Sequence, residues 1–145
     1  MAAGCQVDFY VLSGEAPGPE QLACRLAMMA WEQGHRVSVR TESGQDVRAL
    51  DELMWEIPTG RFLPHEVFGQ NTDAPVLIGE QNEEIPSDRD VVINLAHTVV
   101  PEPGRFTRLL EIVPARSRDR EASRLKFRQY RSEGLEPAHH EIGKN

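Results

Sequence analysis

Five residues near the C-terminus combine positive charge with an aromatic ring. Successive intervals of four, three, one and three residues place them on one stripe of a helix; they are Arg120, Arg124, Phe127, Arg128 and Arg131. Guanidinium groups bind carboxylates bidentately, and the ring between them offers an apolar contact. The stripe therefore suits a ligand that carries carboxylates and has an apolar end.

Two other interpretations of this stripe stay open from the residues alone. Single-stranded nucleic acid also binds basic surfaces with aromatic rings, because its bases stack on them. Alternatively, Phe127 packs inward and the arginines are only solvated. Leu125 and Tyr130 lie elsewhere on the helical wheel, and we expect them to anchor the helix on its sheet.

Charge is unevenly distributed along the chain. The 145 residues carry a formal net charge of −7. Residues 114–131 include seven basic and two acidic side chains, a charge of +5, so the remainder carries −12. Such a remainder argues against a protein that surrounds nucleic acid with its whole surface. The basic segment is instead a candidate interaction surface.

An alternation of strands and helices is expected to position this segment. Apolar runs predict strands at 6–12, 36–41, 75–79 and 90–96. Apolar residues at helical spacing predict helices that begin at Pro19, after Ser43 and near Ser117. Residues 106–113 fit either a helix or a strand, and we favour a strand because Pro114 ends the apolar run abruptly.

This alternation predicts an α/β, Rossmann-like fold with a mostly parallel central sheet flanked by helices. The length fits one domain over residues 1–145. The polar tail, about 135–145, is expected to be loose or to form a short edge strand.

Motifs for nucleotide binding and catalysis are missing from the sequence. The turn at 13–19 has neither G-x-G-x-x-G nor a phosphate-binding lysine, and no G-x-S-x-G nucleophile motif occurs. The case for a metal rests on His139, His140 and Glu141, but adjacent histidines point apart, and we interpret them as part of a solvated tail. We therefore predict no catalytic site, no cofactor and no metal.

Composition also bears on the compartment. No apolar run approaches the ~20 residues that a membrane span needs, and the N-terminus lacks the pattern of a secretion signal. Cys5 and Cys24 are too few for a disulfide framework and are interpreted as reduced thiols. We expect a cytoplasmic protein without membrane contact.

A second candidate surface is apolar. Trp55 lies off the apolar stripe of its predicted helix, and Phe62 and Pro64 follow in the long connection 58–74. Large apolar side chains of this kind form a patch that binds a partner, or they fold back over the connection as a small cluster.

Motifs along nearly the whole chain resemble those of one family, the chi subunit of bacterial DNA polymerase III. They are V-D-F-Y-V-L at 7–12, W-E-Q-G-H-R-V at 31–37, L-D-E-L-M-W at 50–55, F-L-P-H at 62–65, D-V-V-I-N-L at 90–95, E-I-V-P at 111–114 and F-R-Q-Y-R at 127–131. Their order and spacing carry the resemblance, which implies a non-catalytic accessory subunit associated with the clamp loader.

The resemblance also implies two partners. One is the acidic, phenylalanine-terminated tail of the single-stranded-DNA-binding protein, so that the replicase is linked to coated template and DNA is contacted only indirectly. By resemblance, the tail-binding residues are Val113, Arg120, Arg124, Phe127, Arg128 and Arg131. The other partner is the psi subunit, in a one-to-one complex, and its contacts are Trp55, Phe62 and Pro64.

The chain departs from the family pattern at Phe127, where a tyrosine is common, and at Arg120 and Arg128, where a lysine is often found. Two other functions remain as alternatives. The basic helix would bind single-stranded nucleic acid directly, or the α/β scaffold would hold an enzyme for a small molecule.

Overall fold

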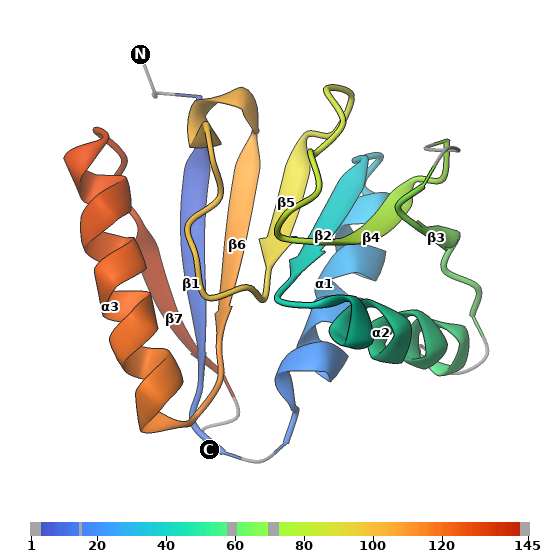
Figure 1. Ribbon diagram of the computed structural model, residues 1–145, viewed down its shortest axis with the longest axis horizontal. Helices are drawn as coiled ribbons and strands as arrows, with labels where there is room; N and C mark the ends of the chain where they lie inside the picture. The colour runs from blue at the N-terminus through green and yellow to red at the C-terminus, as the bar shows by residue number, and fades with distance from the viewer. Residues whose placement is uncertain (1–3, 15, 58–60, 70–72, 143–145) are drawn as a thin grey trace.

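Strands form the centre of the computed structural model. Within residues 4–14, 16–57, 61–69 and 73–142, which are those that the structure describes, seven strands build one sheet (Figure 1). In chain order the elements are β1 (Gln6–Leu12), α1 (Pro19–Glu32), β2 (Val37–Thr41), α2 (Gly44–Glu56), β3 (His65–Val67), β4 (Val76–Glu80), β5 (Val91–Asn94), the 3-10 turn η1 (Pro103–Arg105), β6 (Arg108–Val113), α3 (Ser117–Ser132) and β7 (Ala138–Ile142).

The strand order is β3-β4-β2-β5-β6-β1-β7, and each neighbouring pair is parallel. A parallel sheet with helical crossovers is the Rossmann-like α/β arrangement that the alternation of elements predicts. Because all strands run the same way, their carboxyl ends meet at one edge of the sheet.

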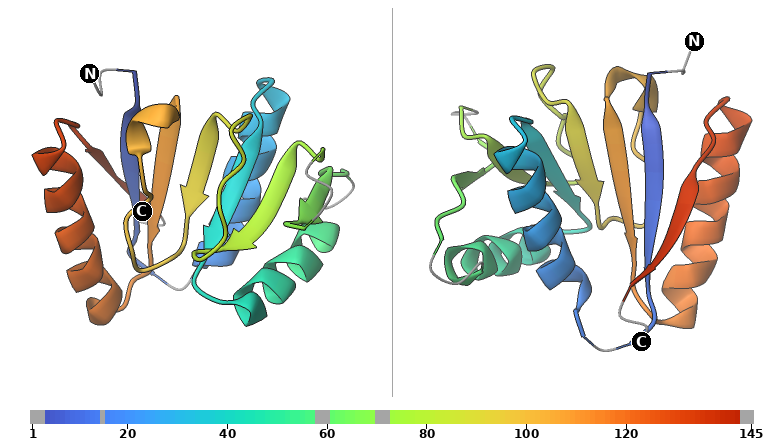
Figure 2. Two further views of the ribbon diagram at one scale, coloured as in Figure 1. Left: turned by 45° about the horizontal axis from the view of Figure 1, so that its top comes forward. Right: turned by 180° about the vertical axis from the view of Figure 1, so that it is seen from behind.

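Helices cover both faces of the sheet. Side chains of a strand alternate between the two faces, and this alternation separates two apolar clusters. Leu12, Leu110 and Ile112 pack with α1 and α2 on one face, whereas Phe9 and Leu109 pack with α3 on the other. Figure 2 shows α3 beside β1 and β7, whereas α1 crosses the middle of the sheet, next to β2, β5 and β6, and α2 lies beside β4 and β3.

Local signals set the helix ends where the sequence predicts them. The Ser43 side chain accepts a hydrogen bond from the Asp46 backbone N–H and caps α2. Gly34 and Gly134 follow α1 and α3 with φ of +90° and +91°, a conformation that favours glycine. Residues 106–113 contain the strand β6, as we favoured.

The structure corrects two sequence-based expectations and decides between the alternatives of a third. The connection 58–74 contains a short strand, β3, at the far edge of the sheet. Residues of the tail form β7, which pairs with β1 from Asp8↔Ala138 to Leu12↔Ile142, so the edge strand is the correct alternative there. His140 is not merely solvated, because its Nε2 lies 2.9 Å from Asp8 Oδ1.

Candidate functional site

A buried polar network determines how α3 lies on the sheet. Lys126 is only 5% exposed, and its Nζ donates to Glu111 Oε1 over 2.7 Å and to the Ala96 carbonyl over 2.9 Å. The Tyr130 hydroxyl donates to Glu111 Oε2 over 2.6 Å and accepts from the Val100 N–H over 2.9 Å. Lys126 and Tyr130 therefore face β5 and β6.

Tyr130 shows how strongly this network is enclosed. Burial, together with the neighbouring carboxylate of Glu111, raises the pKa of its hydroxyl far above the ordinary value. The hydroxyl therefore stays protonated and acts as a fixed hydrogen-bond donor. Tyr130 is the anchor that the sequence analysis expected.

The predicted stripe lies on the flank of α3 that faces β1. Successive helical side chains diverge by about 100°, so Phe127 leaves the helix beside the buried Lys126. Its ring centroid is 5.3 Å from that of Phe9 on β1. Arg120 Nη2 donates to the carbonyl of Leu12 at the end of β1 over 3.3 Å.

We call the four cations of this stripe the arginine flank; they are Arg120, Arg124, Arg128 and Arg131, and all are exposed. In the part of the chain that the structure describes, no carboxylate lies within ion-pair distance of any of them. Phe127 is partly buried against the apolar cluster that contains Val113, which is 2% exposed. The ring between the arginines therefore packs on the apolar cluster that includes Val113, whereas Val113 itself is buried.

Leu125 corrects the sequence analysis. It is 59% exposed and does not anchor α3. The helix turns its polar residues Lys126 and Tyr130 inward because Glu111 is buried on β6, and this orientation leaves Leu125 on the solvent side. Lys126, which sequence reasoning counted with the surface charges, belongs to the core. Its four-residue spacing from Tyr130 is the signal that could have placed both on one inner face.

The apolar surface predicted around Trp55 is also exposed. Trp55 and Phe62 are 63% and 62% exposed, and their ring centroids are 5.9 Å apart. The Trp55 ring lies 4.7 Å from that of His65, whose Nε2 is 3.2 Å from Asp51 Oδ1. Pro64, which lies between Phe62 and His65 in the sequence, is partly exposed. The rings thus contact residues of the connection, as the second interpretation expects, and still remain largely exposed, as the first expects. We call Trp55, Phe62 and Pro64 the aromatic patch.

A cleft of about 870 Å³ opens at the carboxyl ends of the strands. Open α/β sheets bind ligands at this edge. Here four carboxylates, those of Glu20, Glu42, Asp46 and Asp119, outnumber the arginine of the lining, Arg116, and they oppose phosphate. His97 lies between two of them, with Nε2 3.3 Å from Asp119 Oδ1 and Nδ1 3.7 Å from Glu42 Oε2.

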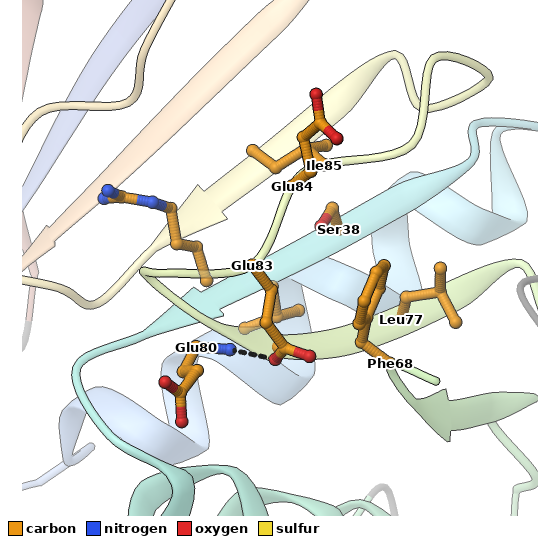
Figure 3. Close-up of a pocket in the computed structure, with 10 residues that line it drawn as sticks. Ser38, Phe68, Leu77, Glu80, Glu83, Glu84 and Ile85 are labelled. Carbon is orange, nitrogen blue, oxygen red and sulfur yellow. Dashed lines mark hydrogen bonds between the residues drawn. The ribbon is translucent and has the colours of Figure 1, made fainter. Parts of the chain in front are cut away.

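The hollow drawn in Figure 3 is much smaller, about 10 Å³, and lies between β2, β4 and the segment around Glu83. Glu83 Oε1 accepts from the Glu80 N–H over 2.9 Å and fixes this segment on the sheet. Gly79 allows the close approach, because a Cβ there would lie 3.2 Å from that oxygen. The volume leaves room for about one water molecule.

The described residues give little support to thiol chemistry or metal binding. Burial, helped by Glu20, raises the pKa of the Cys24 thiol to about 12, which opposes formation of the reactive thiolate. None of the described residues form a cluster of three or more His, Cys, Asp or Glu side chains suited to a metal ion. No helix among them has the length and apolar character to cross a membrane.

Solved structures share the fold. One chain of a Saccharomyces cerevisiae complex of Dbp5 with Nup159, Gle1, IP6 and ADP matches with a TM-score of 0.69 and 9% identity. The match covers 99% of this chain and 44% of that chain. At this identity the likeness concerns the fold alone.

Sequence comparisons are more specific. The family model described as DNA polymerase III chi subunit, HolC, matches residues 5–138. The DNA polymerase III subunit chi of Pseudomonas aeruginosa is 34% identical over 138 residues, which cover 94% of this chain and 96% of the relative. That of Escherichia coli is 29% identical over 134 residues, 88% of this chain and 91% of the relative. The chain therefore belongs to the DNA polymerase III chi subunit family.

Proposed function

We propose that this chain is a non-catalytic subunit that binds the acidic C-terminal tail of the single-stranded-DNA-binding protein through the arginine flank and Phe127. The observation that supports it is a set of four exposed arginines beside a partly buried ring, with no carboxylate of the described chain paired to them. Carboxylates of the tail would pair with the guanidinium groups, and its terminal phenylalanine would lie against Phe127. Val113 would support the ring from below.

Membership in a polymerase subunit family suggests what this binding would be for. The relatives are named as subunits of DNA polymerase III, so a chain that also grips the coat of single-stranded DNA would hold the polymerase near its template. Within this proposal, the aromatic patch of Trp55, Phe62 and Pro64 contacts the psi subunit. The patch is apolar and the flank is cationic, so the two surfaces select chemically different partners.

The test is a binding titration with a fluorescent acidic peptide that ends in Asp-Phe. We expect micromolar affinity, about −8 kcal/mol, which weakens as salt rises. Arg128→Ala should weaken binding by about 1–3 kcal/mol, since it removes a charge-assisted contact. Arg25→Ala removes an exposed arginine of α1 and should leave the affinity unchanged.

Equal affinities for wild type, Arg128→Ala and Arg25→Ala would contradict the proposal. A single-stranded oligonucleotide titrated without peptide tests the direct nucleic-acid alternative, which requires binding in the absence of any partner. For the aromatic patch, Phe62→Ser should abolish co-purification with a co-expressed psi subunit. Peptide binding should be retained in that variant.

A further inference from the structure

We infer that β7 forms the second wall of the tail-binding site, so that the ligand lies in a groove between α3 and β7. His139 and Glu141 would then face the arginine flank across this groove. The inference rests on the proposed function and adds two residues to its site, neither of which was predicted to bind the tail.

Strand register places both side chains. β1 and β7 are parallel, with Phe9 opposite His139 and Val11 opposite Glu141. Residues in register on parallel strands project from the same face of a sheet. Phe9 packs against Phe127 under α3, so His139 and Glu141 project on the side of the sheet that α3 covers.

The intervening residue confirms this alternation. His140 is in register with Tyr10, and the two rings stack with centroids 5.1 Å apart. Its Nε2 also lies 2.9 Å from Asp8 Oδ1. His140 therefore occupies the opposite face, where Tyr10 packs with the cluster beneath α1.

The two walls lie side by side in space. β7 runs next to β1 at the edge of the sheet, and α3 lies beside it in both directions of view (Figures 1 and 2). Neighbouring strands are about 4.8 Å apart, so His139 lies next to Phe9, whose ring contacts that of Phe127. Val11, which is partly exposed, would form the floor of the groove, and the buried Phe9 would lie beneath the ring of Phe127.

The groove is electrostatically asymmetric. α3 starts beyond the carboxyl end of β6, and Arg120 reaches Leu12 at the same end of β1. Leu12 is in register with Ile142, so Glu141, the residue before it, lies at that end too. His139, level with Phe9, marks the middle of the groove. An acidic ligand would therefore lie close to α3, and Glu141 would limit how many carboxylates fit at the Arg120 end.

Charge substitutions on β7 test this placement with the same peptide. His139→Glu should weaken binding about fivefold, since a like charge at about 4 Å costs on the order of 1 kcal/mol in water. Glu141→Gln should tighten binding about twofold to fivefold for the same reason. Gln129→Glu is the matched control, because it adds the same charge to an exposed residue of α3 away from the flank.

If His139→Glu changes the affinity no more than Gln129→Glu does, the inference is wrong, while a loss in Arg128→Ala would still support the proposed function. If Arg128→Ala has no effect either, both are wrong. Peptide added to the unsubstituted chain gives a reading that does not depend on folding of variants. The backbone amides of His139 and Glu141 should shift in the NMR spectrum, and unshifted amides would overturn the inference.

Discussion

Both the inner face and the outer flank of α3 carry positively charged side chains, which are buried on the inner face and exposed on the outer flank. On the inner face, Lys126 is buried and paired with Glu111. On the outer flank, Arg124, Arg128 and Arg131 are exposed and have no carboxylate partner within the described residues. A buried cation without its partner is costly, whereas an exposed one is cheaply solvated. Lys126 therefore holds the helix in place because it is buried and paired. The arginines are available to a ligand because they are exposed.

The largest effect should come from Lys126→Met. Glu111 is 0% exposed, and the substitution leaves its carboxylate buried without its directly paired cation, with only the more distant guanidinium of Arg40 to compensate the charge. Breaking a buried pair on one side typically destabilises by about 3–5 kcal/mol. Urea unfolding followed by circular dichroism measures the loss, with Arg124→Met as the matched control on the outer flank. A loss below about 1 kcal/mol would contradict the structural role of the pair.

Tyr130→Phe removes one hydroxyl from the same network. Glu111 loses a donor, and the buried N–H of Val100 loses its acceptor. An unsatisfied buried group costs about 1–3 kcal/mol, while the ring keeps its contact with Phe9. We expect a loss in that range by urea unfolding, with peptide affinity unchanged. A change in affinity without a change in stability would place Tyr130 in the binding site instead.

A substitution of Asp8 tests how β7, the strand that would form the second wall of the groove, is held on the sheet. Burial alone would raise the pKa of Asp8, but hydrogen bonds from His140, Arg108 and Gln6 outweigh it and hold the pKa below the ordinary value of 3.8. A carboxyl with a lowered pKa stabilises the fold above its unfolded pKa, and the contribution is lost as pH falls through the folded value.

Asp8→Asn should therefore cost about 1 kcal/mol at neutral pH, a modest value because His140 and Arg108 are partly solvated and screened. The difference from wild type should shrink in acid, below about pH 4. Urea midpoints between pH 3 and pH 8 measure both. A difference that stays constant over this range would show that the charge of Asp8 is not what holds the strand.

Local signals explain why some elements could be predicted closely. β1 and α3 begin and end where apolar alternation and the following Gly134 predict. The short strand β3 and the tail strand β7 lack such signals. β7 reads Ala-His-His-Glu-Ile and is mostly exposed, so it exists because β1 offers a row of backbone partners. That pairing joins residues far apart in sequence and leaves no local pattern.

The candidate site likewise has a part that local sequence spacing predicts and a part that depends on contacts between distant elements. Helical spacing alone places the four arginines beside Phe127, because residues three and four apart share a face. The rotation of α3 on the sheet depends on Glu111, a residue of another element, and that contact is why Leu125 is exposed and Lys126 buried. The placement of His139 likewise depends on strand register.

The smallest effect on stability should come from the arginine flank itself. Arg120, Arg124 and Arg128 follow one another at intervals of four residues, and like charges at this spacing destabilise a helix by about 0.2–0.5 kcal/mol per pair. Arg124→Ala removes two such pairs and gains the helix propensity of alanine. Unfolding in urea should therefore show unchanged or slightly raised stability, while the affinity for the acidic peptide falls. A clear loss of stability would mean that Arg124 supports the fold, and the division between the two sides of α3 would be wrong.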